Sequence, residues 1–212
     1  MATVNSLLEL ARRQLGVKED PPGSNKVKYN AWYYGREVSG AAYPWCMVFV
    51  QWVFDRASVK LPTRTASCGA LMRAAQAAGC WVTKGYRPGD VVIYDFPGGA
   101  ATDHCGIVEA VDDSRVSAIE GNTSDASDAD GGAVERRTRR LSLIAGAVRP
   151  TFDEEVEEMR YNTVAECPDW ARETVQKLIN KGYLGGDGQS LDLSHDMVRI
   201  LVIQDRAGSF DQ

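Results

Sequence analysis

The spacing of apolar residues changes at about residue 85, and this change restricts the fold more than any other feature. Before it, apolar residues recur at helical spacing in "NSLLELARRQLG" (residues 5–16), from about residue 44 to residue 57, and in "SCGALMRAAQAAG" (67–79). After it come short runs rich in β-branched residues, separated by Gly, Pro and Asp: "DVVIYDF", "CGIVEAV", "RVSAIEG" and "LIAGAVRP". Helices followed by strands in this order predict an α+β fold, with N-terminal helices packed on an antiparallel sheet.

The segment between the first two predicted helices shows neither pattern. Residues 18–44 are rich in Gly, Pro and aromatic residues and predict a long loop. Long loops in compact domains often carry function, so this loop could line a groove.

The balance of charge divides the chain. Residues 1–150 hold 18 Lys and Arg against 16 Asp and Glu, whereas residues 151–212 hold 6 against 13. The change falls at "RPTFDEEVEEMRYNT", where an acidic run follows Pro150. We therefore expect a first domain over residues 1–150, an acidic linker over 151–163 and a small helical module over 164–212.

The small module reads as two helices joined by a Gly-rich turn. Ser194 is the expected N-cap of the second helix and Gly208 its end. Two apolar faces are expected, one made by Trp170, Val175, Leu178 and Ile179, the other by Met197, Val198, Leu201 and Val202.

Composition excludes two classes of partner. The formal net charge is −5, and no basic stripe with interleaved aromatic residues is present, so we expect no binding of nucleic acid. No segment has the roughly 18 consecutive apolar residues that a membrane span needs, so we expect no membrane insertion. The N-terminus does not show the charged and then apolar pattern of a signal peptide, so we expect that the protein is made in the cytoplasm without an export signal.

The cysteine pattern indicates neither disulfides nor a metal site. The five cysteines are odd in number and widely spaced, and the chain has only two histidines and no C-x-x-C pair. The tract "SDASDADGG" (124–132) is rich in Asp but lacks the spacing and the closing Glu of an EF-hand. We therefore expect free thiols, no metal and no cofactor.

Cys46 lies where a thiol becomes reactive. It stands at the start of the apolar helical run "CMVFVQWVF", where the positive end of the helix dipole lowers the pKa of a thiol. The first domain has one histidine, His104, at the start of a predicted strand, and the next strand carries Glu120 and Asn122. Residues two apart on a strand share a face, so a cysteine, a base and an orienting polar group could converge.

Each of these residues also has a purely structural interpretation. Cysteine is among the most buried residue types, and a lone cysteine in an apolar helix is more often core than nucleophile. Neighbours on a strand face opposite ways, so Cys105, next to His104, is expected to be a core residue rather than a second nucleophile. Core positions are also expected for Cys68, Cys80 and Cys167, and a solvated first-turn position for His195.

The four segments "PWCMVFVQWVF", "RPGDVVIYDF", "DHCGIVEAV" and "IEGNTS", in this order, resemble the CHAP family of cysteine- and histidine-dependent amidohydrolases and peptidases that cut peptidoglycan. The resemblance covers about residues 5–150 and implies a papain-like fold. It also implies that Cys46 is the nucleophile, His104 the general base, Glu120 the residue that orients this histidine, and Asn122 the polar residue that completes the set.

The neighbouring segments "SNKVKYNAWYYG" and "FPGGAATDHCGIVE" are similar to those of phage endolysins of Gram-positive, clostridia-like hosts. The resemblance implies a bacteriolytic enzyme, made in the host cytoplasm, whose partner is bacterial peptidoglycan. It would cut an amide bond through an acyl-enzyme, as an N-acetylmuramoyl-L-alanine amidase or an endopeptidase. The alternatives are a bacterial or mobile-element hydrolase that remodels the wall, and a wall-binding protein with a silent site.

The helical module, with "WARETVQKLINKGYLGGDG", resembles surface-layer-homology-type helices of wall-associated proteins, which implies wall binding. The alternative is a docking hairpin through which the chain forms oligomers. In addition, Met159 follows the pair Glu154 and Glu155 at a spacing that suits internal initiation of translation, which would yield the module alone. An ordinary acidic linker is the simpler interpretation.

Overall fold

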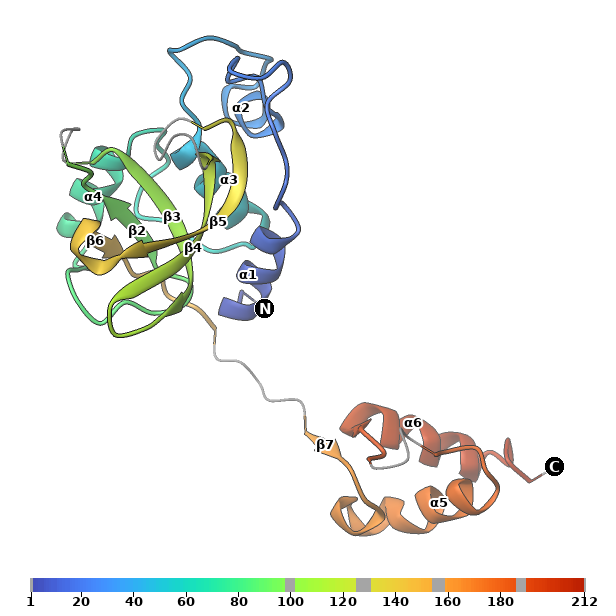
Figure 1. The fold of residues 1–212 in the computed structure, drawn as a ribbon. Coiled ribbons are helices and arrows are strands. Elements are labelled where there is room, and N and C mark those ends of the chain that lie inside the picture. The colour runs from blue at the N-terminus through green and yellow to red at the C-terminus, as the bar shows by residue number, and fades with distance from the viewer. Residues whose placement is uncertain (1, 98–101, 125–130, 154–158, 186–189, 212) are drawn as a thin grey trace. The chain divides into compact units, whose positions relative to one another are not determined.

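The computed structural model describes residues 2–97, 102–124, 131–153, 159–185 and 190–211 (Figure 1). Most of the acidic tract at 124–132 and residues 154–158 of the predicted linker lie outside the described residues. The chain divides into two compact units, Met1–Glu155 and Val156–Gln212. Each unit has a hydrophobic core of its own.

The first unit begins with four helices, α1 (Val4–Arg12), α2 (Lys28–Tyr34), α3 (Cys46–Arg56) and α4 (Cys68–Ala77). Side chains that accept backbone N–H groups fix two of the starts. Thr3 caps α1 in a reciprocal capping box with Ser6, and Ser67 caps α4 by accepting the N–H of Ala70. The three helices that the sequence predicts are confirmed.

Helix α2 corrects the prediction of a continuous loop over residues 18–44. Tyr29 of this helix is completely buried, with its ring centroid 5.6 Å from Trp45, 5.2 Å from Phe49 and 5.2 Å from Trp52. Gly35 ends the helix in the left-handed conformation, with φ of 68°. A helix of seven residues is too short to show a periodic pattern, and its packing on α3 stabilises it.

Within the described residues, six strands form one antiparallel sheet in the order β1-β6-β2-β3-β4-β5. The sheet confirms the α+β class. The strands are β1 (Trp81–Val82), β2 (Val91–Tyr94), β3 (His104–Val111), β4 (Arg115–Thr123), β5 (Ala133–Arg140) and β6 (Ile144–Val148).

Helix α3 is the centre of the first unit. It packs with α1 and α4 in one core against a face of the sheet (Figure 1). Eight of its eleven residues are buried. Gly121 on β4 allows the closest approach, because a Cβ atom there would lie 2.5 Å from Cβ of Phe49 and 2.9 Å from Cζ3 of Trp45. The absence of a side chain at Gly121 therefore brings β4 against the first turn of α3.

Within the described residues, the second unit consists of two short paired strands that are far apart in sequence, a 3-10 turn and two α-helices. Strand β7 (Arg160–Tyr161), which lies in the segment predicted as linker, pairs antiparallel with β8 (Leu193–Ser194). Helix α5 spans Asp169–Asn180 and α6 spans His195–Arg206, and a 3-10 turn over Val164–Glu166 precedes them. The prediction of a small helical module is confirmed, and Ser194 caps α6 by accepting the N–H of Met197.

The prediction of the two apolar faces is wrong for Trp170 and Met197. Trp170 is 44% exposed and Met197 is 46% exposed, because the faces that meet are rotated by about one residue toward Ala171 and Val198. The core of this unit consists of Tyr161, Cys167, Ala171, Val175, Leu193, Val198 and Val202.

Among the described residues, no helix combines the length and the apolar character that crossing a membrane requires.

Candidate active site

Cys46 is the first residue of α3, and the residue before it fixes the start of the helix. Trp45 is completely buried, its Nε1 donates to Oε1 of Glu19 at 2.7 Å, and its ring stacks on Tyr29. The side chain of Cys46 is 7% exposed. The thiol thus lies at a helix N-terminus that the buried Trp45 holds in place, and solvent has little access to it.

His104 and Glu120 form a buried pair on adjacent strands. Nε2 of His104, at the start of β3, lies 3.0 Å from Oε2 of Glu120 on β4, and both side chains are completely buried. Gly106 makes room for the carboxylate, because a Cβ atom there would lie 2.7 Å from Cγ of Glu120. Since Nε2 is engaged, the nitrogen left for Cys46 is Nδ1, which has no direct hydrogen bond within the described residues.

Arg139 binds the Glu120 carboxylate of this His104–Glu120 pair. Its Nε donates to Oε1 of Glu120 at 2.8 Å and its Nη2 to Oε2 at 2.7 Å, which is bidentate geometry. The guanidinium lies 5.1 Å from the ring centroid of Tyr94 and 4.9 Å from that of Phe96, and both rings also stack beside His104. The buried carboxylate is therefore neutralised and held in one orientation.

Sequence reasoning missed Arg139 because it lies in the charged run "ERRTRR", which gives no strand signal. That run is β5, paired with β4. The signal that could have indicated Arg139 is the alternation of side chains between the two faces of a strand, since residues i and i+2 share a face.

The electrostatics favour an ion pair between Cys46 and His104. Burial would raise the pKa of the Glu120 carboxyl, but hydrogen bonds from Arg139 and His104 outweigh it and hold this pKa below its usual range. Burial would lower the pKa of the His104 imidazole, but the interactions of the ring with Cys46 and Glu120 raise it to about 9. The neighbouring thiols of Cys105 and Cys68, together with His104, hold the pKa of Cys46 well below its usual range against the effect of burial. Near neutral pH these directions favour a thiolate beside an imidazolium.

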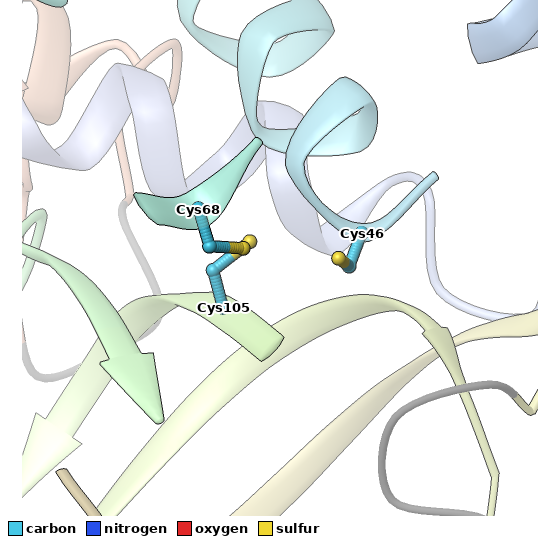
Figure 2. A group of neighbouring side chains, drawn as sticks. All are labelled: Cys46, Cys68 and Cys105. Carbon is cyan, nitrogen blue, oxygen red and sulfur yellow. The ribbon is translucent and has the colours of Figure 1, made fainter. Parts of the chain in front are cut away.

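Two further thiols, those of Cys68 and Cys105, lie beside Cys46 (Figure 2). All five cysteines of the chain are free. The Sγ atoms of Cys46, Cys68 and Cys105 all lie within 4.8 Å of one another. Cys105 is a completely buried core residue as predicted, but its sulfur is near Cys46 rather than remote from it. Burial and the neighbouring thiols raise the pKa of Cys105 well above its usual range, so this group stays protonated.

Asn122 is the fourth predicted site residue, and within the described residues no hydrogen bond joins its side chain to the other three. It is completely buried, has a φ of 58°, and lies where the register of β4 and β5 shifts between Glu120 and Thr123. Its Oδ1 and Nδ2 have no hydrogen-bond partner within the described residues. The structure thus joins Cys46, His104 and Glu120, and leaves the Asn122 amide unpaired in a strained conformation of the kind that clusters at functional sites.

The arrangement has the parts that acyl transfer needs. A cysteine with a lowered pKa is a nucleophile at neutral pH, and a histidine with a fixed ring orientation can move a proton. The first N–H groups of α3 have no acceptor within the helix and point toward the end that carries Cys46. A carboxylate and a guanidinium hold the histidine in place.

Comparisons with known proteins are consistent with this geometry. Residues 38–122 match the model of the CHAP domain, which includes Cys46, His104, Glu120 and Asn122. No curated protein matches the chain.

Solved structures similar to the chain include those of Ly7917 and of a wild-type endolysin, LysIME-EF1. Ly7917 is 19% identical with a TM-score of 0.43, and covers 76% of this chain. Ly7917 "with the hydrolyzing product of MDP" is 18% identical with a TM-score of 0.42 and the same 76% coverage. LysIME-EF1 is 18% identical with a TM-score of 0.41, and covers 72% of this chain. The chain spans 66% of the length of each of these structures.

Proposed function

We propose that the chain is a peptidoglycan hydrolase that cuts an amide bond of the bacterial cell wall through a cysteine acyl-enzyme. The observation that carries this proposal is the continuous chain of interactions from Cys46 through His104 and Glu120 to Arg139. The match of residues 38–122 to the CHAP domain supports peptidoglycan as the substrate.

The reaction proceeds in two steps. The Cys46 thiolate attacks the amide carbonyl carbon, and the imidazolium of His104 gives its Nδ1 proton to the leaving amine, so that a thioester forms as the C–N bond breaks. A water molecule then gives a proton to His104 and attacks the thioester, which releases the carboxylic acid and restores the Cys46 thiolate. Glu120 holds the imidazole ring by accepting from Nε2 throughout, and Arg139 is a positioning residue that acts through Glu120.

The oxyanion that forms during each attack requires hydrogen-bond donors. The N–H of Cys46 is the first candidate because the first N–H groups of a helix have no acceptor within that helix. The Nδ2 amide of Asn122 is the second candidate because it is buried and has no hydrogen-bond partner among the described residues. Both donors would act best in a site that excludes water, as the low exposure of Cys46 indicates.

We further propose that the chain is an endolysin, with a bacterial or mobile-element hydrolase that remodels the wall as the alternative. Both use the same chemistry, and an amidase and an endopeptidase use the same catalytic groups. The third possibility, a wall-binding protein with a silent site, conflicts with the presence of each group that the reaction needs.

The test is digestion of purified peptidoglycan by the full chain and by Cys46→Ser. We expect the parent to release fragments whose masses identify the cut amide bond, and Cys46→Ser to release none because a hydroxyl is a far weaker nucleophile at neutral pH. Cys80→Ser serves as the control, since Cys80 lies outside the thiol cluster. Release of the same fragments by Cys46→Ser would overturn the proposal.

For the second unit we propose either wall binding or association with a second copy. Helix α6 exposes Met197, Ile200 and Ile203, which share a face because they are three residues apart. A dimer in light scattering that dissociates in Ile203→Glu would support association, and sedimentation with insoluble wall that is lost in Ile203→Glu would support wall binding. A monomer that does not sediment with the wall would contradict both.

A further inference from the structure

Three thiols from three different elements meet beside the proposed nucleophile. Cys46 begins α3, Cys68 begins α4, and Cys105 is the second residue of β3. Their side chains point into the same space, with all Sγ atoms within 4.8 Å of one another (Figure 2). The proposed reaction uses only the thiol of Cys46, so the positions of Cys68 and Cys105 need another explanation.

Packing alone accounts poorly for three sulfur atoms in one place. An Ala or Ser side chain would fill much the same space beside Cys46, whereas sulfur adds affinity for soft metal ions. In a tetrahedral zinc site the Zn–S distance is about 2.3 Å, so the sulfur ligands lie about 3.8 Å apart. Sulfur atoms within 4.8 Å of one another need only small side-chain shifts to reach that geometry.

We propose that Cys46, Cys68 and Cys105 form a binding site for a thiophilic divalent cation such as Zn²⁺, and that the bound ion blocks the Cys46 nucleophile. On binding, each thiol that is still protonated releases its proton to solvent and becomes a thiolate ligand, with no oxidation or reduction. The lone pair of Cys46 that would attack a carbonyl carbon is then shared with the metal.

The fold favours a cation at this point, although the thiols of Cys68 and Cys105, whose pKa values are raised by the neighbouring thiols and by burial, stay protonated until the cation binds. Cys46 and Cys68 are both the first residues of helices, so the positive ends of two helix dipoles meet at the cluster. His104 lies beside Cys46, but its ring nitrogens do not belong to the group of ligand atoms that lie within 4.8 Å of one another, and its Nε2 is held by Glu120. A water molecule can supply the fourth ligand.

Sequence spacing predicts no metal site here, because none of the three cysteines belongs to a C-x-x-C pair. The tertiary fold brings the ligands together. The same argument predicts that the site is specific to the folded chain, and that its metal is lost on unfolding.

Zinc binding is tested on the full chain, reduced with a phosphine that does not bind zinc, by competition with a chromophoric chelator. We expect one Zn²⁺ per chain, and a loss of affinity of more than about tenfold in Cys68→Ala and in Cys105→Ala. Cys80→Ala, which removes a thiol outside the cluster, should bind as the parent does. Thermal unfolding of each variant shows whether it is folded, and Cys68→Ser and Cys105→Ser replace any Ala variant that is not.

A spectroscopic measurement separates a three-sulfur site from a site made by Cys46 and His104 alone. Co²⁺ in place of Zn²⁺ should give thiolate-to-cobalt charge-transfer absorption that falls in steps as each ligand cysteine is removed. Equal zinc affinity in the parent and both variants, or absorption that is unchanged in the variants, would overturn the proposal. Absence of zinc binding by the parent would do so as well.

The inhibition part of the inference rests on the proposed hydrolase activity, whereas the binding part does not. We expect Zn²⁺ to stop wall digestion by the parent and EDTA to restore it. Cys68→Ala and Cys105→Ala, which lose a neighbour that helps to lower the pKa of Cys46, should digest the wall more slowly. Their remaining digestion should be less sensitive to Zn²⁺ by the same factor as their loss of affinity. Inactive protein that binds one Zn²⁺ through three thiolates would overturn the hydrolase proposal alone. Active protein whose digestion is unaffected by bound Zn²⁺ would overturn the inhibition.

Discussion

At the scale of single residues, the candidate site depends on a buried carboxylate that would be costly without its partners. Glu120 is completely buried, between Nε2 of His104 on one side and the guanidinium of Arg139 on the other. Removing one partner of a buried ion pair costs far more than the pair itself contributes, because a charge is left without compensation. Arg139 therefore matters to both folding and catalysis.

Arg139→Met should lower the free energy of unfolding at neutral pH by about 3–5 kcal/mol, because Glu120 loses two charged hydrogen bonds in the core. Denaturant unfolding measures this change. The matched control is Arg136→Met on the same strand, whose side chain is 48% exposed and pairs with Glu109, and which should lose at most about 1 kcal/mol. Equal losses in the two variants would contradict the role of Arg139.

The pKa directions predict how the reactivity of Cys46 depends on pH. Because the pKa of Cys46 is held well below its usual range, alkylation by iodoacetamide should already be fast at neutral pH. Because the pKa of His104 is raised to about 9, the imidazolium persists below that pH, and hydrolysis should decline as pH rises through about 9. Alkylation rates and kcat/KM measured over pH check both. A single rise in alkylation at the pH of an ordinary thiol would contradict the ion pair.

Sequence reasoning proposed Cys46, His104 and Glu120 from their places in the chain, and the structure brings these three residues together. Cys46 starts a helix, His104 starts a strand, and Glu120 lies on the next strand. It missed Arg139 and the thiol cluster, since both depend on which residues meet across the sheet and between helices. It also expected Glu120 and Asn122 to share a face, but the register shift between Glu120 and Thr123 interrupts the regular alternation.

At the scale of elements, regular periodicity decided what could be predicted. Helices α1, α3 and α4 and the strands β2, β3, β4 and β6 all have a clear apolar pattern in sequence. Helix α2 does not, because it is short and depends on the burial of Tyr29. Strand β5 does not, because charged side chains dominate it and its stability comes from pairing with β4.

The close contact of β4 with α3 gives a prediction at this scale. Gly121→Ala should destabilise the first unit by about 1–3 kcal/mol, because the new Cβ atom would overlap Phe49 and Trp45. It should also reduce activity, since the same contact sets Glu120 and His104 relative to Cys46. Thermal unfolding and wall digestion measure the two effects. Gly185→Ala is the control, because a Cβ atom there would meet no described residue within 4 Å, and an equal effect there would count against this explanation.

At the scale of the whole molecule, the proposed catalytic residues all belong to the first unit, and the second unit has a hydrophobic core of its own. Each residue proposed for catalysis lies in the unit Met1–Glu155, and Tyr161, Cys167 and the other core residues of the second unit make their own cluster. The shift in charge after Pro150 predicts two parts, and the two compact units of the structure meet between Glu155 and Val156. The sequence could not predict β7 within the predicted linker, because two residues are too few to form a strand pattern.

A chain that ends at residue 153 should therefore fold and keep its activity on soluble wall fragments. The reason is that the first unit has a complete core and every proposed catalytic group. Thermal unfolding and fragment analysis by mass spectrometry check this against the full chain. Loss of cleavage by a truncated chain that is still folded would mean that the second unit contributes to the reaction.

The most direct test of the central claim is to trap the acyl-enzyme. The full chain is mixed with a purified wall fragment, quenched with acid within the first turnover, digested and analysed by mass spectrometry. We predict a thioester adduct, with the mass of the acyl half of the cut fragment, on the peptide that contains Cys46 and on no other cysteine peptide. Cleavage without any adduct on Cys46, and with equal cleavage by Cys46→Ser, would contradict the account.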